Sequence, residues 1–414
     1  MADVIPDIIV IGGGAAGLAA AVTAKARGAR VLLLERNEKL GKKLYITGKG
    51  RCNVCNLCTP EEFLRSVPRN PRFLHAALAH LTPEMLREWL RDMGCPTVVE
   101  RGTRVYPESQ KASDVTRAFA QRLSPGDVRL HARVASLDVE GGQVRGVRME
   151  NGGTLAAAKV IVATGGKSYP LTGSDGDGYR LAAEAGHTVT PLFPSLTGLE
   201  TAEDWPKRLQ GLSLRDVALE AQWPGKGRFR EQGELLLTHF GISGPLTLKL
   251  SSYLSGTDLA QVQVWLDLKP ALDEETLRAR LNRDSAEKGR KRLATLLLEY
   301  MPASLAAEFA ALAGVDGETR AGQLTGAQRQ RLVATLKAIP LRVTRLRPFP
   351  EAVVTRGGVE VREVNPSTME SLLVRGLYFA GEVLDVDALT GGFNLQIAFS
   401  TGALAGAAAA GGKE

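Results

Sequence analysis

The sequence has few of the features that mark exported, membrane-spanning or disulfide-bonded proteins. It contains only four cysteines in 414 residues. No apolar run is long enough to cross a bilayer. The first apolar stretch follows no basic region and ends in glycines, which is unlike a signal peptide. Internal repeats and low-complexity linkers are absent as well. We therefore expect a cytoplasmic protein with no membrane segment, long enough for two or three domains.

The cysteines are few, but three of them are regularly spaced. Cys52, Cys55 and Cys58 form C-x-x-C-x-x-C, and Cys95 stands apart. This spacing suggests an iron–sulfur or zinc site. A two-cluster ferredoxin run adds a fourth cysteine soon afterwards, followed by proline, and this chain has neither. We expect no metal, and no disulfide in a reducing compartment.

Positive charge is in excess, with a formal net charge of +7. Residues 271–347 hold fourteen Lys and Arg against nine Asp and Glu, and the densest run of cations is Lys288, Arg290, Lys291 and Arg292. One interpretation is a solvated helix face. The other is a surface for a polyanion such as RNA.

The most informative stretch begins at residue 7, where an apolar strand runs into a glycine turn and a small-residue helix. Gly12, Gly14 and Gly17 stand in G-x-G-x-x-G register, and a second apolar strand ends on Glu35. Gly12 permits the tight turn, Gly14 lets a pyrophosphate approach the backbone, and Gly17 lets the helix lie close to the strands. The helix N-terminus offers N–H groups to the phosphates. The acid at Glu35 suits a ribose diol and favours FAD or NAD over NADP.

A polar loop follows this unit. It carries Lys42, Lys43 and Arg51 among glycines at 41, 48 and 50. Its position directly after the ribose-binding strand predicts that its cations neutralise the pyrophosphate. The alternative is a mobile surface loop.

Two later stretches again show a strand that ends on glycine. A buried strand ends on Ala163-Thr164-Gly165-Gly166, and another short strand ends on Gly381-Glu382. Gly391-Gly392 then leads into a small-residue helix that carries Asn394 in its first turn. The N-terminus of such a helix can present N–H groups to the polar edge of a flavin ring. The alternative interpretation is one more tight turn.

The middle of the chain differs in pattern. Prolines and short alternating runs over residues 191–270 predict an antiparallel β domain, and apolar periodicity over 271–338 predicts helices. Within the β region, Thr238 to Pro245 combines His239 with two glycines and a proline. His239 is either a structural residue beside a turn or a catalytic residue in a pocket wall.

Taken together, these motifs resemble a bacterial flavoprotein family, the NAD(P)/FAD-dependent oxidoreductases related to aminoacetone oxidase-like FAD-binding enzymes. The resemblance covers essentially the whole chain. It implies an α/β fold in which a Rossmann-like FAD-binding domain of the glutathione reductase type is split by an antiparallel β-barrel-like domain and a helical subdomain. The expected parts are residues 1–190 and 351–414 for the FAD-binding domain, 191–270 and 339–350 for the β-rich domain, and 271–338 for the helical subdomain.

The resemblance also implies which residues line the FAD. By position these are Gly12, Gly14, Ala16, Gly17, Glu35, Arg36, Lys43, Arg51, Cys52, Val134, Thr164, Gly165, Gly381, Glu382, Gly392, Asn394 and Leu395. One departure is that Cys55 takes a position where the family usually has threonine. The extra cysteines therefore look like drift on a flavin loop, which further weakens the metal interpretation.

The reaction implied is hydride transfer at flavin N5, so we expect an FAD-dependent oxidoreductase. Only one dinucleotide fingerprint is present, so NAD(P)H as electron donor would dock transiently. Cys52 and His239 are the candidate proton donors or acceptors, although Cys52 could simply pack beside the flavin. Family members have been associated with amine oxidation, steroid reduction and dihydrouridine formation in ribosomal RNA. The substrate is accordingly a small molecule, such as an amine, or uridine in ribosomal RNA. An alternative from another class is an RNA-binding protein with a structural FAD. The sequence indicates no oligomeric state.

Overall fold

The computed structural model describes residues 5–225 and 227–411. This part of the chain divides into two compact units. Unit 1 is built from residues up to 195 together with those from 348 onward, and unit 2 comprises residues 196–347. The expected FAD-binding segments also include residues 1–4 and 412–414, which lie outside the described residues. None of the helices in the described part has the length and apolar character needed to cross a membrane.

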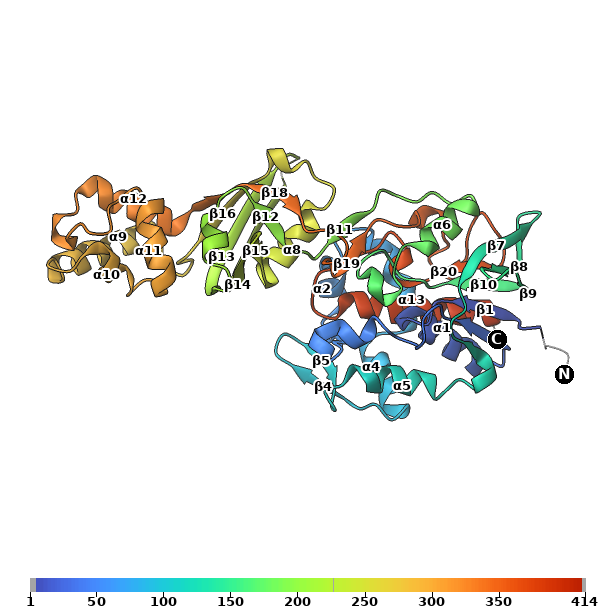
Figure 1. Cartoon of the computed structure of the whole chain (residues 1–414). Helices are drawn as coiled ribbons and strands as arrows, with labels where there is room; N and C mark the ends of the chain where they lie inside the picture. Colours follow the sequence, from blue (N-terminus) through green and yellow to red (C-terminus); the bar gives the residue numbers. More distant parts are fainter. Residues whose placement is uncertain (1–4, 226, 412–414) are drawn as a thin grey trace. The chain divides into compact units, whose positions relative to one another are not determined.

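Unit 1 is organised around a parallel sheet of five strands (Figure 1). In spatial order these are β20 (Leu377–Phe379), β10 (Lys159–Val162), β1 (Ile8–Ile11), β2 (Val31–Leu34) and β6 (Val128–Arg129). The three central strands are almost entirely buried apolar residues. Continuous apolar strands are what a parallel sheet covered on both faces requires.

Two helices from opposite ends of the chain pack closely in this unit. They are α1 (Ala15–Ala26) and α13 (Phe393–Ala410), and both consist mainly of small residues. A Cβ at Gly402 would collide with the carbonyl of Ala16, and one at Gly406 with the carbonyl of Ala20. The glycines therefore allow the two backbones to approach, which joins the N-terminal and C-terminal segments into one core.

Smaller elements complete unit 1. The antiparallel sheets contain β3 (Cys55–Asn56), β5 (Arg104–Pro107) and β4 (Thr97–Glu100); β7 (Val134–Glu140), β8 (Gln143–Met149) and β9 (Thr154–Ala156); and β11 (Phe193–Ser195) with β19 (Val354–Arg356). The helices are α2 (Pro60–Arg65), α3 (His75–His80), α4 (Pro83–Asp92), α5 (Ala112–Ala120) and α6 (Asp177–Glu184). The chain leaves unit 1 after β11 and re-enters it at Pro348, shortly before β19. The strands β11 and β19, which pair with each other, therefore flank the segment that forms unit 2.

Unit 2 combines one antiparallel sheet with helices. The strands, in spatial order, are β17 (Ile339–Leu341), β16 (Gln263–Asp267), β13 (Ser213–Trp223), β14 (Gly227–Thr238), β15 (Gly241–Ser243), β12 (Leu199–Thr201) and β18 (Val343–Leu346). The helices are α7 (Trp205–Arg208), α8 (Pro245–Leu254), α9 (Glu274–Glu287), α10 (Leu293–Leu297), α11 (Ala303–Leu312) and α12 (Gly326–Lys337). Leucines from both strands and helices fill its separate core.

The expected fold class is confirmed. The chain is a mixed α/β protein with a Rossmann-like parallel sheet built from both ends of the sequence and antiparallel sheets between them. Residues 191–270, where short alternating runs predicted antiparallel strands, include β13 and β16, which pair antiparallel.

Candidate functional site

The candidate site lies where the parallel strands of unit 1 end. The carboxyl ends of β1, β2, β10 and β20 lead respectively into Gly12, Glu35, Thr164 and Gly381, after one linking residue in the last two cases. Ligands of open parallel sheets bind outside this edge. Four of the sequence motifs are therefore brought to one edge of one sheet.

The glycine turn has the geometry expected of a dinucleotide fingerprint. Gly12 has φ +102°, and a Cβ there would lie 2.6 Å from the carbonyl oxygen of Ala163. A Cβ at Gly17 would collide with the carbonyl of Gly12. At Gly14, by contrast, a Cβ would meet no atom of the described residues within 4 Å beyond its own chain neighbours. Two of the glycines are thus required by packing, while the third faces open space at the start of α1, where a pyrophosphate could approach.

Glu35 is a buried acid fixed by three donors. Its Oε2 accepts the N–H of Gly13 at 2.7 Å, and its Oε1 accepts the backbone and side-chain N–H groups of Asn37 at 2.8 and 2.7 Å. These bonds hold the carboxylate against the glycine turn. The placement is compatible with the predicted contact to a ribose diol.

Lys43 and Glu382, which are far apart in the sequence, form an ion pair in the structure. Lys43 Nζ donates to Glu382 Oε2 and to Ser168 Oγ, each at 2.8 Å. Glu382 Oε1 accepts the N–H of Thr355 in β19 at 2.8 Å and the hydroxyl of Ser168 at 3.1 Å. The polar loop after β2, the stretch after β10 and the stretch after β20 therefore meet in one network.

The backbone at the N-terminus of α13 is fixed by a tightly packed glycine and by an asparagine side chain. Gly392 has φ +100°, and a Cβ there would collide with the carbonyl of Cys55 and lie 2.9 Å from Asn53 Oδ1. Asn394 accepts the N–H of Ala388 at 2.9 Å and donates to the same residue's carbonyl at 2.7 Å. The side chain of Asn394 is therefore occupied in fixing the preceding loop. The N–H groups of this first helical turn, rather than that side chain, are the donors available to a ligand.

Unpaired buried atoms provide a further test of fit to a cofactor. The buried side-chain oxygens Thr164 Oγ1 and Asn53 Oδ1 have no hydrogen-bond partner among the described residues. Buried polar atoms are normally paired. Both atoms belong to the stretches that converge on the sheet edge and the α13 turn, as expected where a polar ligand completes the site. The residues present therefore fit a dinucleotide cofactor.

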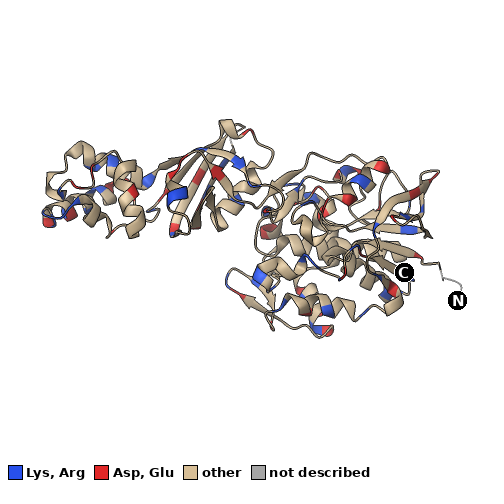
Figure 2. Cartoon of the chain, in the orientation of Figure 1, with Lys and Arg blue, Asp and Glu red and all other residues tan. Residues whose placement is uncertain are grey.

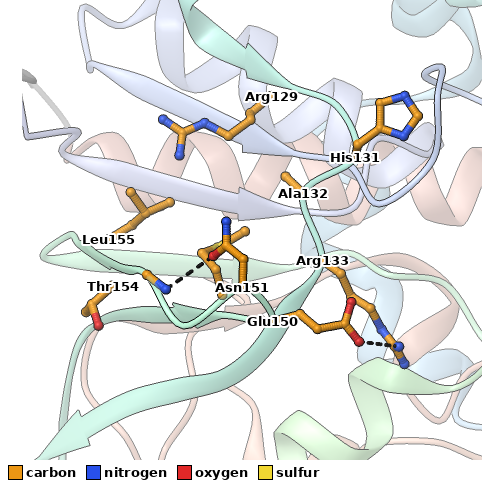
Figure 3. Close-up of a pocket in the computed structure, with 10 residues that line it drawn as sticks. Arg129, His131, Ala132, Arg133, Glu150, Asn151, Thr154 and Leu155 are labelled. Carbon is orange, nitrogen blue, oxygen red and sulfur yellow. Dashed lines mark hydrogen bonds and ion pairs between the residues drawn. The ribbon is translucent and has the colours of Figure 1, made fainter.

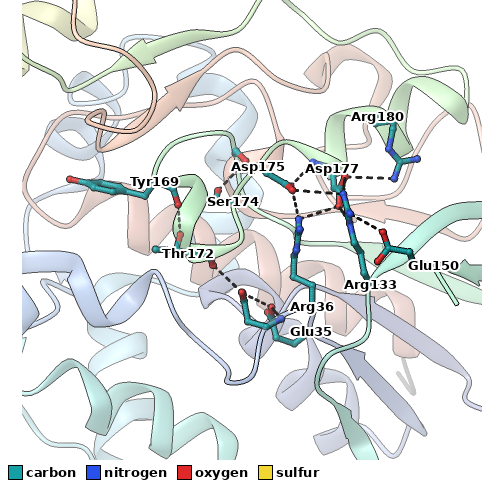
Figure 4. A network of polar contacts seen from close by, with 12 residues as sticks. Glu35, Arg36, Arg133, Glu150, Tyr169, Thr172, Ser174, Asp175, Asp177 and Arg180 are labelled. Atoms are coloured by element: carbon teal, nitrogen blue, oxygen red, sulfur yellow. Dashed lines mark hydrogen bonds and ion pairs between the residues drawn. The ribbon is translucent and has the colours of Figure 1, made fainter.

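Two arginines that were predicted to contact the cofactor form ion pairs with carboxylates of the protein. Arg36 pairs with Asp175 and with Asp177, the latter at 3.3 Å (Figure 4). Arg133 donates to Asp177 at 2.8 Å, and this bond is the main cause that lowers the pKa of Asp177. Arg51 pairs with Glu100 and lies 4.1 Å from the centre of the Tyr106 ring.

The predicted chemistry residues have contrasting environments. Cys52 is fully buried, and burial raises the pKa of its thiol to about 12. The thiol therefore stays protonated near neutral pH, which favours packing over proton transfer. Burial raises the pKa of the Cys58 and Cys95 thiols to about 11 as well. Within the described residues, no three His, Cys, Asp or Glu side chains are grouped as metal ligands.

His239 belongs to unit 2, where it lies in the turn between β14 and β15. It is exposed, and its ring contacts that of Phe240 edge-on, with centroids 5.1 Å apart. Its catalytic role stays a prediction.

The remaining predicted residues are placed in unit 1. Ala16 lies in the first turn of α1 and would contact a Cβ at Gly381; Gly165 has φ +76°; Val134 begins β7 and is buried; Leu395 is half-buried in α13. A pocket of about 360 Å³ lies beside the segment preceding β7 (Figure 3). It is lined by Arg129, His131, Ala132, Arg133, Met149, Glu150, Asn151, Gly153, Thr154 and Leu155, and contains none of the predicted cofactor residues.

The sequence interpretation missed one acidic cluster in the segment that connects Glu382 to the α13 turn. Asp385 is paired through both oxygens with the guanidinium of Arg69. Asp387 is only 1% exposed; its Oδ2 accepts the hydroxyl of Ser195 at 3.2 Å. Its Oδ1 has no hydrogen-bond partner in the described part of the chain. Both acids lie between two motifs that the sequence reveals, Gly381-Glu382 and Gly391-Gly392, but their burial depends on residues far away in the sequence.

The chain is similar to several known proteins over nearly its full length. The family model described as "HI0933-like protein Rossmann domain" matches residues 6–408. A 3-dehydro-bile acid delta(4,6)-reductase of Clostridium scindens is 31% identical over 409 residues, covering 97% of this chain and 98% of that protein. A ribosomal RNA dihydrouridine synthase of Escherichia coli is 31% identical over 396 residues, covering 95% and 96% respectively.

Among solved structures, 3-ketosteroid delta1-dehydrogenase from Sterolibacterium denitrificans, in complex with 1,4-androstadiene-3,17-dione, is similar in fold. Its TM-score is 0.51 at 16% identity, and the match covers 98% of this chain and 99% of that one.

Proposed function

The chain belongs to the HI0933-like Rossmann-domain family and is an FAD-dependent oxidoreductase, and from that premise we propose that it reduces a carbon–carbon double bond conjugated to a carbonyl group. The observation that carries the proposal is the chemistry common to two relatives. Both match this chain over nearly its full length at 31% identity.

The names of these relatives describe different substrates but one type of bond change. A delta(4,6)-reductase acting on a 3-dehydro compound saturates a double bond conjugated to the 3-ketone. Dihydrouridine is uridine saturated at the C5–C6 bond, which is conjugated to the C4 carbonyl. For the C4–C5 bond of the steroid and the C5–C6 bond of uridine, a hydride adds to the carbon β to the carbonyl and a proton adds to the α carbon. Small-amine oxidation shares the cofactor but not this bond change.

The residues of unit 1 supply the binding part of this function. The N–H groups at the start of α1 and the open space at Gly14 would hold the pyrophosphate of FAD, and Glu35 would hold its adenosine ribose. The N-terminus of α13 would face the polar edge of the flavin ring. Bound FAD would supply the hydride chemistry. The Lys43–Glu382 pair and Ser168 together fix three of the cofactor segments relative to one another.

The electron donor is proposed to be NAD(P)H. The sequence holds a single dinucleotide fingerprint, so the nicotinamide would dock against the flavin ring only transiently. Anaerobic mixing of the FAD-loaded protein with NADH or NADPH should bleach the flavin absorbance. Failure of both, with dithionite still bleaching it, would exclude nicotinamide donors.

The reaction class is tested with conjugated acceptors. The protein, reduced anaerobically, should be reoxidised by a 3-oxo-4,6-diene steroid or by unmodified ribosomal RNA, with the saturated product detected by mass spectrometry. A small amine should not reduce the oxidised flavin. Amine-dependent bleaching without reoxidation by either conjugated acceptor would overturn the proposal in favour of amine oxidation.

Ribosomal RNA is a second candidate substrate because two relatives carry the name ribosomal RNA dihydrouridine synthase. The charge of the helical segment gives it less support than the sequence alone suggested. Lys288 and Lys291 both pair with Glu299, and Arg292 pairs with Glu318. Cations and anions are interspersed over these helices (Figure 2). Steeply salt-dependent RNA binding and loss of dihydrouridine from ribosomal RNA in a deletion strain would support this candidate.

A further inference from the structure

Conjugate reduction requires a proton for the α carbon as well as a hydride for the β carbon. Of the two side chains singled out from the sequence, Cys52 does not release a proton readily. The Cys52 thiol is buried, and its pKa is about 12. His239 belongs to unit 2, where it is exposed and its ring contacts that of Phe240. A different group in unit 1 has the required features.

We propose that Asp387 is the residue that delivers the proton to the substrate's α carbon, holding it on the oxygen Oδ1 that has no protein partner among the described residues. This inference rests on the proposed function. In the step, the hydride and the proton add across the double bond, the flavin becomes oxidised, the substrate is reduced, and Asp387 is left as a carboxylate. Solvent then returns a proton to it.

The first argument is the placement of Asp387. It lies between Glu382 and the α13 turn, and the adjacent residue Ala388 is bonded to Asn394 in the first turn of α13. That helix N-terminus is the one proposed to face the flavin ring. On the other side, Thr355 of β19 donates to Glu382. The next residue of that strand, Arg356, is one of the charged groups that act on Asp387. Asp387 is therefore fixed between two parts of the proposed cofactor site.

The second argument is its unequal hydrogen bonding. Ser195 supplies one hydrogen bond to Oδ2, whereas Oδ1 is buried with no partner in the described residues. An ionised carboxylate in this position would leave an acceptor unsatisfied, which is costly. Protonation removes the buried charge and so lowers that cost, and an acceptor atom of the substrate at Oδ1 would pair the resulting O–H. The neighbouring Asp385 differs because Arg69 satisfies both of its oxygens.

The third argument is electrostatic. The pKa of Asp387 is raised to about 6, chiefly by burial and also by Asp385, while Arg356, Ser195 and Arg69 act in the opposite direction. A general acid works best when its pKa lies near the operating pH. These opposing neighbours leave the carboxyl able to hold a proton and to release it near neutral pH.

The test compares the FAD-loaded wild type with Asp387→Asn, which keeps the shape but cannot donate an acidic proton. With whichever conjugated probe the wild type reduces, the 3-oxo-4,6-diene steroid or ribosomal RNA, reoxidation of the reduced flavin should slow by roughly 100-fold or more. FAD binding and flavin reduction should change less than about twofold. Asp284→Asn, a buried acid of unit 2 that accepts the hydroxyl of Tyr300, is the matched control and should leave the rate unchanged.

Two readouts separate proton delivery from a structural effect. In D2O, the wild type should place deuterium on one face of the α carbon, and the residual product of Asp387→Asn should lose that selectivity. Ser195→Ala removes a bond that lowers the pKa of Asp387, so the pH dependence of reoxidation should shift to higher pH. Retained rate and selectivity in Asp387→Asn would overturn the proposal.

Failure of the proposed function leaves a separate outcome. If the wild type reduces neither probe, infrared difference spectra of the FAD-loaded protein between pH 5 and pH 8 still report on the carboxyl. A protonated-carboxyl band that is absent from Asp387→Asn and shifts when the flavin is photoreduced would support Asp387 as the proton-holding group. Its absence would reject that assignment. Should Asp387→Asn fail to fold, Asp387→Ser serves in its place.

Discussion

Both units of this protein bury aspartates, but only unit 2 satisfies all of those compared. In unit 2, Asp267 accepts from Lys337 and from the N–H of Lys269 at 2.7 and 2.8 Å, and Asp284 accepts the Tyr300 hydroxyl at 2.6 Å. In unit 1, Asp387 is equally buried but leaves one oxygen without a partner in the described residues. A buried aspartate oxygen is thus left for a ligand or a proton in unit 1, as the proposed role of Asp387 requires.

A second comparison concerns one glycine from each unit and the space that a side chain would have there. Gly402 of α13 is pressed against the backbone of α1, so that no side chain fits there. Gly233 of β14 would place a Cβ at 3.4 Å from the side chain of Leu246, an ordinary contact. At these two positions, α1 and α13 of unit 1 meet by close backbone approach, whereas β14 and α8 of unit 2 meet through a leucine side chain.

The largest expected effect follows from this difference in packing. Gly402→Ala should lower the free energy of unfolding by about 3 kcal/mol or more, because the new methyl group meets a carbonyl that cannot move independently. Gly233→Ala should change it by less than about 1 kcal/mol. Denaturant unfolding followed by circular dichroism measures both. Equal effects of the two substitutions would remove the contrast.

The aspartates provide the next prediction, through the dependence of stability on pH. The folded-state pKa of Asp387 is raised from 3.8 to about 6. The penalty for ionising it is therefore absent below its ordinary pKa and develops as the pH rises through about 6. At pH 8 the penalty approaches about 3 kcal/mol, since each pKa unit corresponds to about 1.4 kcal/mol.

Asp387→Asn should therefore stabilise the protein at pH 8 and have little effect at pH 4, as measured by denaturant unfolding at each pH. Asp284→Asn should instead destabilise it at pH 8, by about 1 kcal/mol, since its carboxylate is paired and its pKa is lowered. Destabilisation by Asp387→Asn at pH 8 would show that the carboxylate is satisfied in solution.

The sequence predicted the part of this comparison that depends on local pattern. The spacing of Gly12, Gly14 and Gly17 indicates the turn. The apolar strand before them and Glu35 after them are recognisable from the local sequence. The pairing of Lys43 with Glu382 could not be derived in that way, because they stand 339 positions apart and only the folded sheet brings them together. The partners of Asp387 come from similarly distant segments. Arg36 and Arg51 were assigned to the cofactor by position, and the structure additionally pairs them with carboxylates.

The smallest expected effect concerns a fully satisfied polar group in unit 1. Ser371 Oγ accepts the N–H groups of Leu373 and Val374, so its own hydrogen points to Nε2 of His187 at 2.8 Å, and Nδ1–H of His187 donates to Glu363 at 3.1 Å. This buried imidazole is therefore neutral.

Burial lowers the pKa of His187, so stability should fall as the pH drops below the ordinary value of 6.5. One proton accounts for a slope of at most about 1.4 kcal/mol per pH unit. Unfolding measured between pH 7 and pH 5 should lose this contribution in His187→Gln. An unchanged slope in that variant would assign the acid sensitivity to other groups.

The central claim is that main-chain N–H groups of unit 1, at the start of α1, hold FAD through the open space at Gly14. The most direct test is a spectroscopic titration of FAD into the wild type and Gly14→Ala, with circular dichroism confirming that both are folded. We predict that the wild type binds one FAD and that Gly14→Ala, whose methyl group has room in the protein itself, binds it at least about tenfold more weakly, a loss of roughly 1.4 kcal/mol. A folded wild type that does not take up FAD, or a variant that binds it equally well, would contradict the account.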